Sequence, residues 1–199
     1  MAILRVAQMG HPVLRMVAEP IDPDLIGSDD FQRFCDDMLD TMDEYNGAGL
    51  AAPQVHEPIR VVCLTIDPDV GPEFLINPEI EALTEATSRT VEGCLSVSGL
   101  RAAVDRPNHI RVRAWGRDGR RKHYELKGFP AVVTQHECDH LDGILYVDRA
   151  DPLTFAFLPE YEKYGSLDQY VEGEAASDDI ADEIILLDPE AEAPEEDNS

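Results

Sequence analysis

One short pattern, His136-Glu137-Cys138-Asp139-His140, restricts the possible folds of this chain more than any other stretch. If the segment is helical, His136 and His140 lie about one turn apart, so both side chains leave the same face and can bind one metal ion. Glu137 then lies beside them, within reach of a water molecule on that ion. The pattern therefore predicts a helix that carries a metal site, in preference to a surface helix with two unrelated histidines.

Two helices can be placed from their boundary residues. Pro130 suits a first helical position and Gly143 suits the residue just past a helix end, which predicts that the motif lies on a helix between them. An earlier helix is predicted over residues 31–45, where apolar residues recur at steps of three and four. Ser28 or Asp29 is its expected cap.

Three short stretches rich in β-branched and aromatic residues are predicted to be strands: residues 59–66, 109–115 and 123–126. The turn residues at 117–120 join the last two as an antiparallel hairpin. Because strands come before one late helix, the order of elements predicts an α+β fold.

The motif supplies two ligands, so a third must come from elsewhere in the chain. A metzincin pattern fails, because Tyr146 stands where that pattern needs a histidine. A thermolysin-like pattern would use Glu160, but Pro159 directly precedes it, and this remains the weaker alternative. Cys94 is the better candidate, because a thiolate is a strong ligand and Gly93 lets the backbone approach closely. We therefore expect a Cys-His-His site with one open position.

The charge of the chain is strongly unbalanced, with 16 Lys and Arg against 41 Asp and Glu. Residues 168–199 contain 13 acidic and no basic residues. We therefore predict a folded domain over residues 1–165 and an acidic, largely disordered tail over residues 166–199, in which the apolar residues at 180 and 184–187 could dock. Such acidity disfavours binding to nucleic acid or to anionic membranes.

No apolar run approaches the roughly 18 residues of a membrane span, and the first residues do not resemble a signal peptide. The four cysteines are unevenly spaced in a chain large enough to fold without bridges. We therefore expect a cytoplasmic protein with reduced thiols. Cys138 is expected to be buried and inert, and the remaining histidines show no ligand spacing.

Three segments, in the same order as in a known family, carry a resemblance: residues 47–54 (GAGLAAPQ), 92–96 (EGCLS) and 135–140 (QHECDH). Further matches are spread over most of residues 1–150. The chain resembles the peptide deformylases. The resemblance implies antiparallel β-sheets packed around a central helix that carries the motif.

The resemblance also implies roles for individual residues. It implies three metal ligands: Cys94, His136 and His140. Glu137 is then the general acid/base, and Gln54 with the backbone N–H of Leu95 stabilises the oxyanion. The implied cofactor is one ferrous ion per chain, with zinc, nickel or cobalt as working substitutes.

The backbone of residues 47–52, including Ala48, Gly49 and Leu50, is expected to pair with an extended peptide. Arg101 resembles a family arginine near the peptide backbone, although a solvated strand residue is an equal alternative. Val132 and Val133 precede His136 by four and three residues, and on a helix they would line an apolar pocket that suits methionine. For Val132, simple core packing is the alternative.

The implied reaction is removal of the N-formyl group from the N-terminal methionine of newly synthesised polypeptides, with release of formate. Ala48 and Ser98 depart from the usual residues of the family, which leaves a second hypothesis open, a related hydrolase of another formylated amine. A silent metal-binding protein is disfavoured, because it would not need Glu137 or Gln54. N-formylmethionyl nascent peptides are the implied partners, and any transient ribosome contact would not use the acidic tail.

Glu92 lies close to Cys94 and is acidic, so it must be engaged elsewhere if it is not to disturb the thiolate. We expect a salt bridge or hydrogen bond, with Arg106 as one candidate partner.

Overall fold

The computed structural model describes residues 2–165 and 182–188. The predicted disorder of the acidic tail falls mainly on residues 166–181 and 189–199, which lie outside the described residues. Within the described ranges, no helix is long and apolar enough to cross a membrane.

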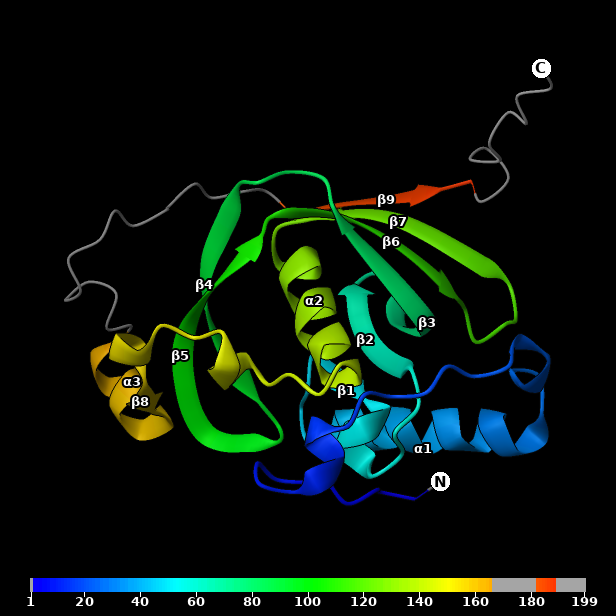
Figure 1. The fold of residues 1–199 in the computed structure, drawn as a ribbon, viewed down its shortest axis with the longest axis horizontal. Coiled ribbons are helices and arrows are strands. Elements are labelled where there is room, and N and C mark those ends of the chain that lie inside the picture. Colours follow the sequence, from blue (N-terminus) through cyan, green and yellow to red (C-terminus); the bar gives the residue numbers. More distant parts are fainter. Residues whose placement is uncertain (1, 166–181, 189–199) are drawn as a thin grey trace.

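The described strands form two antiparallel sheets (Figure 1). The larger sheet runs in the order β1 (Gly49–Ala51), β2 (Val61–Asp67), β3 (Gly71–Ala82), β6 (His109–Trp115), β7 (Arg121–Lys127) and β9 (Glu183–Leu187). The smaller sheet contains β4 (Thr87–Cys94), β5 (Val97–Pro107) and β8 (Ala156–Phe157). The described residues also form short 3-10 segments: Pro12–Arg15, Pro23–Leu25, Ala52–Val55, Tyr146–Asp148 and Pro152–Thr154.

Helix α2 (Phe129–Leu141) lies between the two sheets (Figure 1) and contacts β1, β2 and β7 on one side and β5 on the other. It is therefore enclosed, and 11 of its 13 residues are buried. A helix with polar and charged side chains at such depth must satisfy them with specific partners. The fold predicted from the sequence, α+β with antiparallel sheets around this helix, is confirmed.

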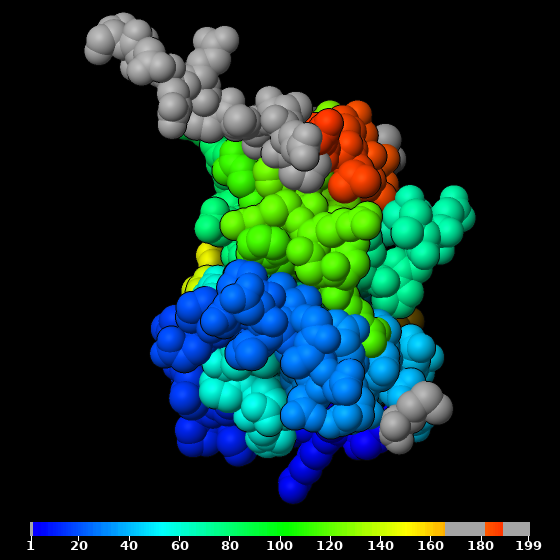
Figure 2. All heavy atoms as spheres, turned by 90° about the vertical axis from the view of Figure 1, so that its right-hand side faces the viewer, coloured from blue at the N-terminus to red at the C-terminus, as the bar shows by residue number. Residues whose placement is uncertain are grey.

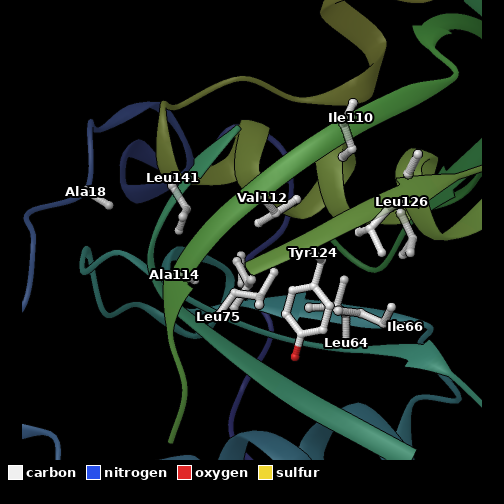
Figure 3. Close-up of a cluster of buried hydrophobic side chains, with 14 residues drawn as sticks. Ala18, Leu64, Ile66, Leu75, Ile110, Val112, Ala114, Tyr124, Leu126 and Leu141 are labelled. Carbon is white, nitrogen blue, oxygen red and sulfur yellow. The ribbon is translucent and has the colours of Figure 1, made fainter. Parts of the chain in front are cut away.

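Strand β2 separates two parts of the core. Its side chains alternate, so that Leu64 packs on the α2 side and Cys63 on the side of helix α1 (Asp29–Glu44). Figure 3 shows the first cluster, where Leu75, Val112 and other apolar side chains from the large sheet meet between the strands and α2. The large sheet is thereby fixed against both helices.

The predicted helices and hairpin are confirmed with small shifts in their ends. Ser28 caps α1 by accepting a hydrogen bond from the Phe31 amide, and β6 has the predicted bounds. Strand β2 begins two residues later than predicted, because Ile59 instead pairs with Glu19 in an isolated bridge. The third helix, α3 (Leu158–Tyr164), follows β8 on the rim of the smaller sheet.

Candidate metal centre

The three predicted ligands come together between the sheets. Cys94 ends β4 at a tight turn into β5, and His136 and His140 project from α2. Their ligand atoms all lie within 4.8 Å of one another, and Cys94 Sγ is 3.3 Å from His140 Nε2. No other group of three such ligands occurs among the described residues.

Glu92 fixes the orientation of His136. One carboxylate oxygen of Glu92 lies 2.7 Å from His136 Nδ1, which leaves Nε2 for the ligand position. Arg106 donates to both oxygens of Glu92 over 2.5 and 3.0 Å, so the expected pairing of Glu92 with Arg106 is confirmed. Burial would raise the pKa of Glu92, but the hydrogen bonds from His136 and Arg106 outweigh it and hold the pKa below its usual value.

The network of ion pairs around Arg106 extends to Asp139 and Arg149. Arg106 also donates to Asp139 on α2 over 2.8 Å, and Arg149 donates to both oxygens of Asp139 over 2.7 Å. Arg106 is only 3% exposed. Buried charges of this kind are tolerated only when each is paired, and here the pairing fixes α2 to β4 and β5.

Glu137 lies beside the ligands and faces strand β1. Burial raises its pKa to about 7, which suits a group that must both take and give a proton near neutrality. Its Oε2 has no hydrogen-bond partner within the described part of the chain. A Cβ on Gly49 would lie 2.6 Å from Glu137 Cγ, so only glycine lets β1 approach this carboxylate.

Gln54 presents its amide nitrogen to the site. Its Oε1 accepts a hydrogen bond from the Ala51 amide over 2.7 Å, which fixes which end of the side chain faces inward. Its Nε2 then lies 3.2 Å from Ser96 Oγ and 3.5 Å from Cys94 Sγ. A donor held in this way is suited to stabilising developing negative charge.

A cavity of about 680 Å³ opens beside these residues. It is lined by five of the six residues expected to bind substrate, namely Ala48, Gly49, Arg101, Val132 and Val133, and also by Leu95. Leu50 is different, because its side chain is fully buried in the cluster around α1 and does not line the cavity. Only its backbone, in edge strand β1, is placed to meet a ligand.

The donor atoms suit a transition metal. A thiolate and two imidazoles form a set that takes zinc or iron, with room for a further ligand. Glu137 Oε2 is buried beside the ligands without a hydrogen-bond partner among the described residues, so a polar atom remains to be satisfied here. Burial lowers the pKa of His140 and favours the neutral imidazole that a metal requires.

The sequence profile of the polypeptide deformylases matches residues 3–156, which is more than half of the chain. The chain belongs to this family. It is accordingly a hydrolase that removes the N-formyl group from the N-terminal methionine of peptides, a step in protein biosynthesis.

Individual deformylases support this assignment. The peptide deformylase of Stutzerimonas stutzeri is 46% identical over 151 residues, covering 74% of this chain and 87% of that protein. The structure of the Thermotoga maritima enzyme has a TM-score of 0.71 at 35% identity and covers 76% of this chain and all of the other. The Acinetobacter baumannii enzyme, bound to Met-Ala-Ser, gives a TM-score of 0.70 at 35% identity, covering 74% and 98%.

Other expectations also have clear outcomes in this deformylase. Cys138 is buried, lies outside the ligand cluster and has a pKa raised by burial, as expected of an inert thiol. The alternative ligand Glu160 is exposed on α3 and is not part of the cluster. Gly93 makes room for a side chain rather than for an ion, because its missing Cβ would lie 2.2 Å from the guanidinium of Arg101.

Sequence reasoning assigned no role to several residues that support the site. Tyr146, considered only as a failed ligand, stacks on His136 with ring centroids 6.0 Å apart. Asp139 lies within the motif itself and Arg149 within a segment that carried the resemblance, so both offered a signal. Ser96, the partner of Gln54, follows Cys94 by two positions.

Proposed function

We propose that this deformylase acts in the cytoplasm on N-formylmethionyl nascent peptides and uses one ferrous ion held by Cys94, His136 and His140. Zinc, nickel or cobalt would substitute for iron. The observation that carries the proposal is the convergence of these three ligands beside a buried carboxyl, Glu137. When bound, the cation supplies the Lewis acidity that activates water for attack on the formyl carbon.

Glu137 is the proton carrier in this proposal. Its carboxylate takes a proton from the attacking water and later gives one to the amine nitrogen that leaves. A pKa of about 7 suits both directions of transfer at neutral pH. Gly49 leaves the space in which this carboxyl sits.

Gln54 and Leu95 act on the formyl oxygen. As water adds, this oxygen becomes negative, and donors already aimed at it stabilise the transition state more than the substrate. Gln54 Nε2 is held toward the cavity by the bond that its Oε1 accepts from Ala51. The Leu95 amide lies in the turn that follows Cys94 and is the second proposed donor.

The peptide is proposed to lie along β1, the outer strand of the large sheet. Its backbone would pair with the edge of residues 48–50, a mode that makes few demands on side chains after the first. Val132 and Val133 would form an apolar wall for the methionine side chain, and Arg101 lines the same cavity. The Met-Ala-Ser complex of the Acinetobacter baumannii relative supports a peptide ligand of this kind.

The direct test is formate release from a short N-formyl-methionyl peptide by anaerobically iron-loaded protein. Glu137→Gln should lower turnover by roughly 10²–10⁴-fold while the metal content stays unchanged. Glu160→Gln is the matched control and should behave like the native protein, because this glutamate is exposed on α3. Cys94→Ser should lose metal.

The controls separate the alternatives. An unformylated peptide should remain intact, since peptide-bond cleavage would indicate a protease. If a full metal site gave no formate from the peptide but did so from a small formylated amine, the peptide substrate would be wrong.

A further inference from the structure

The C-terminal strand contacts the helix that carries the motif. Asp182, immediately before β9, accepts a hydrogen bond from the backbone N–H of Phe129 with an N–O distance of 2.8 Å. Phe129 is the first residue of α2, so the contact joins two segments 53 residues apart in the sequence. In Figure 1, β9 lies alongside β7 near the end of α2 where the helix begins.

Helix α2 has no cap of its own at this end. Gly128, in the cap position, has a φ of 68° and no side chain to accept a hydrogen bond, and no acidic residue lies in the first turn. Pro130 contributes no N–H. Asp182 therefore supplies, from a distant segment, the hydrogen-bond acceptor that a local Ser, Thr or Asp supplies in most helices. Its carboxylate also places a negative charge at the N-terminus of α2.

Asp182 is held firmly enough to act on the helix. Strand β9 pairs with β7 in five registered positions, from Lys127 with Glu183 to His123 with Leu187. Lys127 and Glu183 also form an ion pair, and Ile184 packs against the core between the large sheet and α2. Figure 2 shows β9 at the surface beside the hairpin of β6 and β7.

The first turns of α2 form part of the cavity wall. Phe129, Val132 and Val133 all line the cavity, and Phe129 is 55% exposed. The two histidine ligands and Glu137 lie further along the helix, where the Glu92–Arg106–Asp139 network holds α2 independently through His136 and Asp139. A shift at the start of α2 therefore changes the wall more than the metal centre.

We infer that Asp182 is a positioning residue for deformylation, which holds the first turn of α2 so that Phe129 and Val132 form the binding wall for the peptide. The inference rests on the proposed role of that wall in substrate binding. It gives Asp182 a function in substrate binding, although this residue touches no reacting atom.

The test compares Asp182→Ala with Asp182→Asn, which keeps an oxygen acceptor, and with Glu183→Gln, which removes only the neighbouring ion pair. Removal of a cap changes a local equilibrium by about fivefold, so Asp182→Ala should raise the KM for the formylated peptide roughly fivefold. The kcat and the bound metal should stay unchanged. Asp182→Asn and Glu183→Gln should remain near native values.

Two further readouts do not depend on turnover. Hydrogen exchange of the Phe129 amide should become faster in Asp182→Ala, with or without metal, and Met-Ala-Ser should bind more weakly in proportion to the rise in KM. Faster exchange with unchanged KM and peptide affinity would reduce Asp182 to a structural cap, and an equal change in Glu183→Gln would overturn its specific role. If the native protein released no formate, the proposed function would fail, while exchange and peptide binding would still decide the inference.

Discussion

The two ends of α2 are held in opposite ways. The C-terminal half, from His136 to His140, is locked by buried ion pairs to both β4 and β5. The N-terminal half lines the cavity with Phe129, Val132 and Val133, and within the described ranges it receives one side-chain acceptor, the carboxylate of Asp182. Separate contacts therefore hold the two halves of the helix.

The largest effect is expected from removing Arg106, whose ion pairs hold the C-terminal half of α2. Arg106→Met would leave Glu92 and Asp139 buried without their shared partner, and breaking such a pair costs about 3–5 kcal/mol of stability. Urea unfolding should show this loss, together with weaker metal retention. Arg149→Met is the control, because Arg149 is 46% exposed and Asp139 would keep Arg106. Equal losses in both variants would contradict a lock centred on Arg106.

A substitution at Gly49 tests how tightly β1 packs against the side chain of Glu137. Gly49→Ala would place a Cβ 2.6 Å from Glu137 Cγ and push the carboxyl away. A misplacement of this order costs about 10²-fold in rate, so kcat should fall by that amount with metal still bound. Gly27→Ala is the control, since no heavy atom lies within 4 Å of its added Cβ. A normal kcat in Gly49→Ala would show that the carboxyl has room to move.

Val132 and Val133 lie in the N-terminal half of α2, and substituting each one separates a role in stability from a role in substrate binding. Both line the cavity, but only Val133 also belongs to the core cluster beneath the large sheet. Val133→Ala should therefore cost about 1–2 kcal/mol of unfolding free energy. Val132→Ala should cost less stability and mainly raise the KM for the formylated peptide. Thermal unfolding and steady-state kinetics on both variants measure the difference, and identical profiles would argue against it.

The smallest effect is expected at an exposed ion pair outside α2. Arg15 pairs with Asp148, and this hydrogen bond, with one from the Leu145 amide, holds the pKa of Asp148 below its usual value. A depressed carboxyl pKa adds stability above the pKa of the unfolded chain and loses it as pH falls through the folded pKa. Because both side chains are more than a third exposed, solvent screening keeps the contribution under about 1 kcal/mol.

The measurement is the difference in stability between the native protein and Arg15→Met, followed as pH falls. The difference should shrink once Asp148 is protonated. A difference that is constant with pH would mean that the pair contributes by packing alone.

The sequence was most informative where chemistry or local periodicity determines residue type. The cluster of Cys94, His136 and His140 could be predicted because a histidine pair one turn apart and a thiolate have few other uses together, and α1 because its apolar face repeats. Strand β4 could not be predicted in this way, because its one fully buried residue is the charged Glu92 and no apolar alternation marks it.

Contacts between distant segments were the main part that could not be predicted. Nothing local in the acidic C-terminal sequence distinguishes Asp182 from its neighbours, and its role depends on the pairing of β9 with β7. Arg106 was expected to pair with Glu92, but its second ion pair, with Asp139, depends on the enclosure of α2, which no local pattern in the sequence shows. The burial of the Leu50 side chain could not be predicted for the same reason, since the packing of α1 decides which way it points.

Strand β9 also affects how copies of the protein meet. By pairing with β7 it covers backbone groups that would otherwise template association with another chain, but it becomes an outer strand itself. That strand is only five residues long, and Asp182, Glu183 and Asp188 flank or begin it. Like charges on two approaching copies repel each other, so these acidic residues protect this margin of the sheet against aggregation.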